Sequence, residues 1–145
     1  MANTNTNIET LNSFLRGEIS AVETYRQAIA RVSDAKMKDE MEQCLHDHEH
    51  RVESIRERVE KLGGKPSQGS GIWGAFAKLT QAGADLLGEK SAIQAIEQGE
   101  DHGLADYNRD VDKTHGEVRR FVRMELLPAQ KSTHARMSRL KKTLH

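Results

Sequence analysis

The sequence predicts an all-α protein, a bundle of four long helices in a single domain covering residues 1–145. Apolar side chains recur at spacings of three and four residues along four segments, which is the period of an amphipathic helix. Only two prolines interrupt these segments. Charged residues make up 30% of the chain and hydrophobic residues 36%, a balance typical of long helices that each bury a narrow stripe.

The first helix is predicted over residues 7–32, with Thr6 and Glu9 forming a capping box at its start. Its inward stripe contains both an acid and a phenol among aliphatic side chains. The members of this stripe are Ile8, Leu11, Leu15, Glu18, Val22, Tyr25 and Ile29. The sequence therefore places the carboxylate of Glu18 inside the bundle.

The second helix is predicted to begin near Ser33-Asp34 and to end at Gly63-Gly64, which provides suitable C-cap residues. One imidazole, that of His48, falls in its stripe, while His46 and His50 point away from it. The full stripe is Met41, Leu45, His48, Val52, Ile55, Val59 and Leu62.

A connection of almost thirty residues follows, and residues 71–88 within it are predicted to form a short amphipathic helix. The third helix is expected from Ser91, capped by Gln94, and the fourth after Thr114, capped by Glu117 and kinked at Pro128. A long crossover between the second and third helices is typical of ferritin-like bundles.

Two segments of the chain repeat one pattern. RGEISAVETY (residues 16–25) and QGEDHGLADY (residues 98–107) both carry Gly-Glu followed by Tyr, with an offset of 82 positions between them. This repeat predicts two helical hairpins related by a pseudo-twofold axis, with Glu18 facing Glu100. Two buried carboxylates that face each other repel unless a positive group lies between them.

We therefore expect a metal site at the middle of the bundle. Two histidines converge on the same layer, and Glu49 or Gln130 can complete the site. The candidate ligands are Glu18, His48, Glu49, Glu100, Gln130 and His134. Oxygen and imidazole donors suit iron, manganese or zinc. The alternative is that each acid is satisfied by a tyrosine hydroxyl or an arginine from another helix and merely fixes the packing register.

Composition argues against several other functions. The 22 basic and 22 acidic side chains balance, so nothing draws the chain to nucleic acid. No stretch approaches the length of apolar sequence that spans a bilayer. Cys44 is the single cysteine, which rules out an intramolecular disulfide and favours a reducing, cytoplasmic compartment.

LNSFLRGEISAVETY (residues 11–25) resembles the first helix of rubrerythrins, and QGEDHGLADY resembles their third helix. The whole chain is similar to short bacterial ferritin-like proteins of unknown function. The similarity rests on LGGKP (residues 62–66), on Gly99-Glu100-Asp101 with Tyr107, and on His134. The resemblance implies a dimeric four-helix bundle. It also implies metal binding, either at a di-iron centre or at another kind of metal site, and an association with stress.

One departure from that resemblance concerns the metal ligands. Di-iron bundles place Glu-x-x-His on the second and fourth helices. In this chain Leu45 stands three residues before His48, and Lys131 stands three residues before His134.

The leading hypothesis is a metal-binding protein in which Glu18, His48, Glu100 and His134 hold iron and react with oxygen or peroxide. Tyr25 and Tyr107 would then be hydrogen-bond partners of the acids. The rival hypothesis is a metal-free helical stress or scaffold protein that acts through protein association, with Trp73 and Phe76 as its contact surface. Whether the protein is an enzyme stays open at this point.

Overall fold

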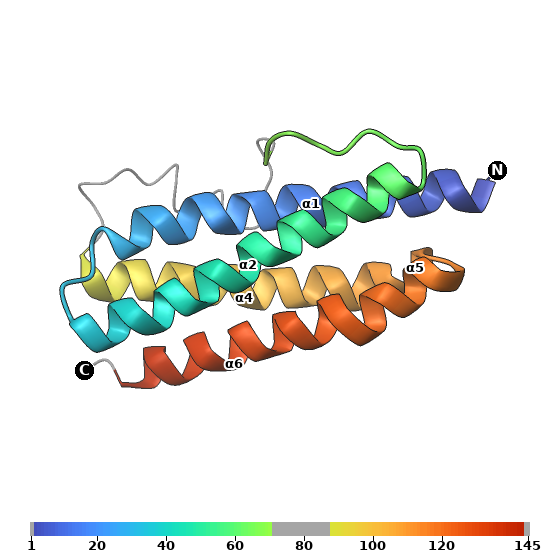
Figure 1. The fold of residues 1–145 in the computed structure, drawn as a ribbon. Helices are drawn as coiled ribbons and strands as arrows, with labels where there is room; N and C mark the ends of the chain where they lie inside the picture. Colours follow the sequence, from blue (N-terminus) through green and yellow to red (C-terminus); the bar gives the residue numbers. More distant parts are fainter. Residues whose placement is uncertain (1, 71–87, 144–145) are drawn as a thin grey trace.

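The computed structural model describes residues 2–70 and 88–143, and within these ranges the chain is helical without strands. Three long helices, α1 (Ala2–Ile29), α2 (Ala35–Lys61) and α4 (Glu89–Asp110), run side by side with a fourth, composite arm (Figure 1). The predicted all-α bundle is confirmed. The short helix expected over residues 71–88 lies almost entirely outside the described residues.

The fourth arm consists of three consecutive helical pieces after a 3₁₀ turn (η2, Val111–Lys113). These pieces are α5 (Gly116–Phe121), the π-helix η3 (Val122–Leu126) and α6 (Leu127–Lys142). Pro128 stands in the first turn of α6. Because proline lacks an N–H group and its ring crowds the carbonyl four residues earlier, the wider π turn in front of it lets the helix continue.

The two hairpins predicted from the repeat pack against each other. Helix α1 contacts both α2 and α4, and α6 contacts both α4 and α2, so the arms close into one bundle (Figure 1). Among the described residues, no helix combines the length and the apolar character needed to cross a membrane.

Helix α1 begins at Ala2 rather than at residue 7, so the predicted capping box of Thr6 and Glu9 is wrong. The Thr6 hydroxyl instead donates to the Ala2 carbonyl inside the helix, at 3.0 Å. A tertiary contact holds these first turns: Asn7 accepts from the His115 backbone N–H at 2.8 Å and donates to its carbonyl at 3.2 Å.

Helix α2 has the ends that the sequence predicts. The Asp34 carboxylate accepts from the Met37 backbone N–H at 2.9 Å, which caps the first turn. Gly63 adopts the left-handed φ of 84°, and Gly64 N–H returns to the Val59 carbonyl at 3.0 Å. This geometry ends the helix because glycine reaches positive φ without strain.

The other two predicted capping boxes are absent. Helix α4 starts at Glu89 behind Gly88, and no side chain caps it. The fourth arm starts after His115, and the Thr114 hydroxyl donates to the preceding Val111 carbonyl instead. Thr114 therefore closes the 3₁₀ turn rather than opening the helix.

The interior contains two apolar clusters separated by a polar layer. One surrounds Leu11, Ile55 and Phe121, and the other surrounds Ile29, Met41 and Ile93. Between them lie buried polar and charged side chains from all four arms: Glu18, His48, Arg51, Glu100, Gln130 and Thr133. This layer contains the candidate site.

Candidate functional site

The buried layer is built around one imidazole that bridges two carboxylates. His48 Nδ1 lies 2.5 Å from Glu18 Oε1, and His48 Nε2 lies 2.6 Å from Glu100 Oε2. The exposed fractions of the three residues are 1%, 3% and 0%, so water does not screen these contacts. The two acids of the repeat thus meet at the centre of the bundle, with His48 between them.

The tyrosines of the repeat bind the acids crosswise. Tyr25, on the helix of Glu18, donates to Glu100 Oε2 at 2.5 Å. Tyr107, on the helix of Glu100, donates to Glu18 Oε2 at 2.6 Å. Burial and the neighbouring carboxylates raise the pKa of both phenols well above the ordinary value, so both remain donors. The Glu-Tyr spacing of the repeat therefore ties α1 to α4.

Arg51, which helical periodicity did not single out, lies in the middle of this layer and is only 2% exposed. Its Nη1 donates to Glu18 Oε2 at 3.1 Å and to Gln130 Oε1, and its Nη2 donates to Thr133 Oγ1 at 2.9 Å. Its Nε donates to Asp47 at 3.1 Å. The available signal was its place three residues after His48, which puts it beside that imidazole on the inward side of α2.

Gln130 and Thr133 complete the layer from α6. The Gln130 amide donates to the Glu100 backbone carbonyl at 2.8 Å and to Glu100 Oε1 at 2.9 Å. The Thr133 hydroxyl donates to Glu100 Oε1 at 2.8 Å. Gly103 makes room for this, since a Cβ there would lie 2.9 Å from Gln130 Nε2. Gln130 was predicted as a metal ligand, and the structure places it as a hydrogen-bond partner of Glu100 and Arg51.

Two of the predicted ligands lie outside the cluster. The His134 imidazole, with a side chain 24% exposed, contacts Asp101 at 3.3 Å. The Glu49 carboxylate contacts Arg26 at 2.8 Å and His46 at 3.1 Å on the surface. Each follows an inward residue by one position, and a helix turns by about 100° per residue, so each points away from the layer.

The charges of the cluster balance. Burial alone would raise the pKa of Glu18, but the Arg51 and His48 cations outweigh it and lower this pKa to about 2. The pKa of Glu100 is lowered as well, against its burial, chiefly by His48. Burial and Arg51 disfavour a charged imidazole, yet the two carboxylates raise the pKa of His48 above the ordinary value. Two anions therefore face two cations.

Every buried side-chain nitrogen and oxygen in the described part of the chain has a hydrogen-bond partner. A cavity of about 30 Å³, enough for one water molecule, reaches Glu18, His48 and Gln130 from between α1 and α4. Gly17 and Gly103 line it. The cluster is therefore closed on itself apart from this small opening.

The comparisons with known proteins agree with the fold. The family described as a domain of unknown function, DUF2383, matches residues 6–113, which is well over half of the chain. The chain belongs to this family. A solved structure of a ferritin-like, diiron-carboxylate protein from Bacillus anthracis str. Ames superposes with a TM-score of 0.76. The superposition covers 97% of this chain and 99% of that chain at 19% identity, so it shows a shared ferritin-like fold. Among curated proteins, none matches the chain.

The inward residues of this DUF2383 protein do not fit a di-iron centre. Di-iron bundles use a Glu-x-x-His pair on each of two helices. The inward pairs at that spacing here are His48 with Arg51 on α2 and Gln130 with Thr133 on α6. Two carboxylates are missing, and a guanidinium and a hydroxyl stand where imidazoles are needed. Within residues 2–70 and 88–143, no three His, Cys, Asp or Glu side chains are grouped to hold a metal ion.

Proposed function

We propose that this ferritin-like protein works without a metal ion, that its buried cluster is structural, and that it acts through protein association, first of all as a homodimer. The observation that carries the proposal is the guanidinium of Arg51 in the polar layer. In a ferritin-like metal centre, metal cations neutralise inward carboxylates. Here Arg51 and His48 neutralise Glu18 and Glu100.

The charged side chains of the cluster are engaged in hydrogen bonds with one another and with their neighbours, so they are not available to act on a substrate. Both carboxylates accept two or more hydrogen bonds each, and both nitrogens of His48 are engaged. Burial and Glu100 raise the pKa of the Cys44 thiol to about 12, which keeps it protonated and unreactive. These groups support packing rather than turnover.

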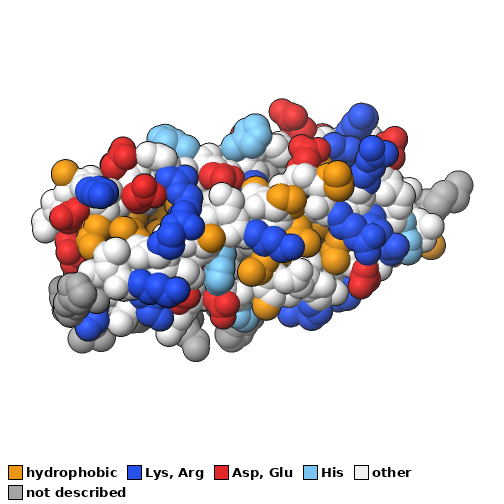
Figure 2. Space-filling model, turned by 90° about the horizontal axis from the view of Figure 1, so that it is seen from below, with side chains coloured by type: hydrophobic (Ala, Val, Ile, Leu, Met, Phe, Trp, Pro, Cys, Tyr) orange, Lys and Arg blue, Asp and Glu red, His pale blue; other side chains and the backbone are white. Residues whose placement is uncertain are grey.

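The outer surface supports association between copies. Seen from below, acidic and basic side chains are intermixed over the surface, with hydrophobic groups between them (Figure 2). A groove of about 310 Å³ lies between α1 and α2, with Ile19, Val22 and Val52 among its lining residues. Its rim carries Glu23 and the ion pair of Arg26 with Glu49, so a second copy turned by a twofold axis can bring its Arg26 towards Glu23.

The test of the metal-free proposal is elemental analysis of protein purified without a histidine tag, followed by thermal unfolding with chelator and with added ferrous iron. We expect less than one metal ion per ten chains and melting curves that coincide under all three conditions. A stoichiometric metal content, or a melting temperature that chelator lowers, would contradict the proposal.

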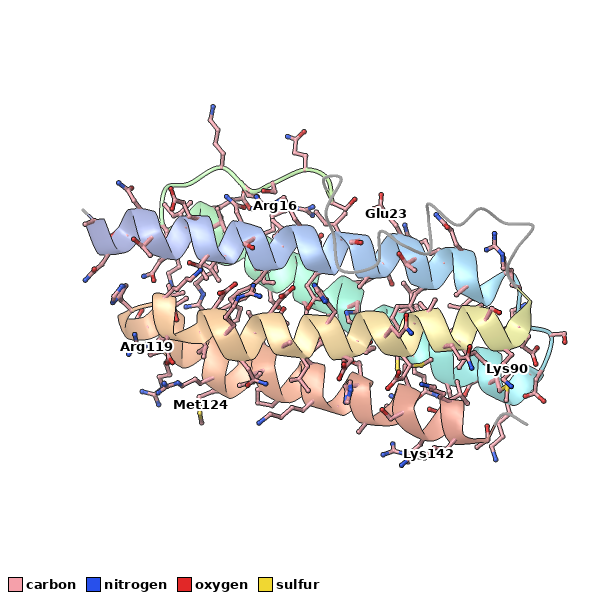
Figure 3. All side chains as sticks on the ribbon, turned by 180° about the vertical axis from the view of Figure 1, so that it is seen from behind. Arg16, Glu23, Lys90, Arg119, Met124 and Lys142 are labelled. Carbon is pink, nitrogen blue, oxygen red and sulfur yellow. The ribbon has the colours of Figure 1, made fainter. Side chains whose placement is uncertain are left out.

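The dimer is tested by light scattering on the wild type and on Ile19→Glu, with Met124→Glu as the matched control. Ile19 lines the groove, whereas Met124 is 68% exposed on the fourth arm (Figure 3). We expect the wild type and Met124→Glu to have the mass of two chains and Ile19→Glu that of one. A monomeric wild type would refute the dimer.

A second candidate function is binding of one iron, manganese or zinc ion by Glu18, His48 and Glu100, followed by oxidation of ferrous iron or consumption of peroxide. One observation favours it: Glu18 and Glu100 each lie within 2.6 Å of one nitrogen of His48, and a cavity that admits water reaches Glu18 and His48. The imidazole weakens this candidate because its two nitrogens face the acids on opposite edges of the ring. The elemental analysis described above distinguishes the two candidates.

A further inference from the structure

We infer that Arg51 is the residue that excludes metal ions from the cluster, and that the substitution Arg51→His opens a site for one divalent cation beside Glu18, where Gln130 and Thr133 also meet the guanidinium. This inference rests on the proposed metal-free function and extends it by naming its determinant.

The first step is position. The Arg51 guanidinium contacts the acid of α1 and both inward polar residues of α6, and its Nη2 lies 3.4 Å from His48 Nε2. It therefore fills the point at which oxygen atoms from α1 and α6 converge. Without it, Glu18 Oε2, Gln130 Oε1 and Thr133 Oγ1 lose a common donor at the same place, and such oxygen atoms are ligands that divalent cations accept.

The second step is charge. With Arg51 and the imidazolium of His48 present, the two carboxylates are already neutralised. A dication entering this layer would leave a net positive charge in a buried site even if His48 lost its proton, and that is costly. When a neutral imidazole replaces Arg51 and His48 is neutral, one dication and two carboxylates balance. Only the variant therefore accommodates the ion without unpaired charge.

The third step is spacing. Arg51 is the second member of an inward i, i+3 pair on α2 whose first member is His48. Helix bundles place a metal-binding histidine at this second position. The Arg51→His substitution thus introduces its imidazole on the backbone that already aims the guanidinium at Glu18. The cavity between Gly17 and Gly103 reaches Glu18 and His48 and has room for one water molecule beside the ion.

The experiment is a titration of metal-free protein with Co²⁺, followed by visible absorption and by calorimetry. The samples are the wild type, Arg51→His, Arg51→Lys and the double variant Arg51→His with Glu18→Gln. The matched control is Arg56→His, which adds a histidine to the same helix at a residue that forms a surface pair with Glu53. This control accounts for binding by the surface histidines of α2.

We expect Arg51→His to bind one Co²⁺ per chain at least about tenfold more tightly than the wild type, Arg51→Lys and Arg56→His. Glu18→Gln added to Arg51→His should abolish the gain. Binding by the wild type with the affinity of the variant would refute the metal-free function. Absence of binding by both the wild type and Arg51→His would overturn the role of Arg51 alone and leave the metal-free function standing.

Should Arg51→His be unfolded in metal-free buffer, the readout becomes its helical circular dichroism as Co²⁺ is added. Metal binding that requires the folded site drives folding. Recovery of helicity with Co²⁺, but not with Mg²⁺ at the same ionic strength, supports the inference. A chain that stays unfolded at saturating Co²⁺ overturns it.

Discussion

Arg51 is a cation buried among two carboxylates, an imidazolium and two neutral acceptors, and its removal leaves the Glu18 charge without its strongest partner. We predict that Arg51→Ala lowers the free energy of unfolding by about 3–5 kcal/mol, the usual cost of breaking a buried ion pair. Urea unfolding followed by circular dichroism measures it. The exposed pair of Arg56 with Glu53 provides the control, since Arg56→Ala should cost at most about 1 kcal/mol. Equal losses for Arg51→Ala and Arg56→Ala would show that the buried arginine contributes no more to stability than the exposed one.

The tyrosine hydroxyls are the second residue-scale feature of the cluster. Tyr25→Phe and Tyr107→Phe each remove one donor to a buried carboxylate. We predict a loss of about 1.5–3 kcal/mol for each, as for hydrogen bonds to charged groups. Thr24→Val serves as the comparison, because it removes a buried hydroxyl that donates to an uncharged acceptor, the Ser20 carbonyl. Similar losses in all three variants would contradict a special role for the Glu-Tyr pairs.

Helical periodicity was sufficient to predict that Glu18, His48, Glu100 and both tyrosines lie inside. It was insufficient for Arg51, because a charged side chain is normally assigned to the surface and its burial depends on partners from other helices. His134 shows the limit of the same method. One position separates it from the inward Thr133, and a stripe read from sequence cannot resolve an angular error of one residue.

At the scale of elements, the close approach of α4 to α6 depends on a glycine. A Cβ at Gly103 would lie 2.9 Å from Gln130 Nε2, and that amide is held by Glu100 and Arg51. A Cβ at Gly17, on α1, would have no neighbouring atom within 4 Å in the described part of the chain. We predict that Gly17→Ala stabilises the fold by about 0.5–1 kcal/mol through helix propensity.

Gly103→Ala gains the same propensity but displaces Gln130. We predict that it is less stable than Gly17→Ala by about 1–3 kcal/mol, the range for overpacking. Paired thermal and urea unfolding of the two variants measures the difference. Equal stabilities would mean that Gln130 moves aside without cost and that its contacts do not hold the layer.

The sequence predicted the existence and the order of the helices correctly, but three of the predicted N-terminal caps are absent from the structure. Caps are local patterns, and tertiary contacts override them: Asn7 extends α1 by binding the backbone at His115, and Thr114 is used by its own turn. The caps of α2 were correct because Asp34 and Gly63 act within their own segments. Sequence patterns therefore predicted helix ends correctly where the capping contacts are made within the same segment of the chain.

At the scale of the whole molecule, a charged layer divides the apolar interior into two clusters and links all four arms. Its protonation therefore controls global stability rather than one helix. The pKa of Glu18 is about 2 in the folded state against an ordinary 4.5, so this group stabilises the fold above pH 4.5 and ceases to do so as the pH falls towards 2. His48 has a raised pKa, so its contribution is complete below its ordinary value of 6.5 and disappears as the pH rises through the higher folded value.

We therefore predict a free energy of unfolding that is greatest between pH 4.5 and 6.5 and falls on both sides. On the acid side Glu18 contributes roughly 3 kcal/mol, since each unit of pKa difference is worth about 1.4 kcal/mol. Urea unfolding of the wild type across this range measures the profile.

Two variants test whether Glu18 causes the loss of stability on the acid side of this profile and His48 the loss on the alkaline side. Glu18→Gln is less stable at its optimum, and its acid limb should be shallower, because the group that takes up a proton is gone. His48→Gln should flatten the alkaline limb for the same reason. Glu53→Gln, which alters an exposed carboxylate, should retain the full profile of the wild type. If Glu18→Gln kept the wild-type acid limb, the charge of the buried layer would not be what links the stability of this bundle to pH.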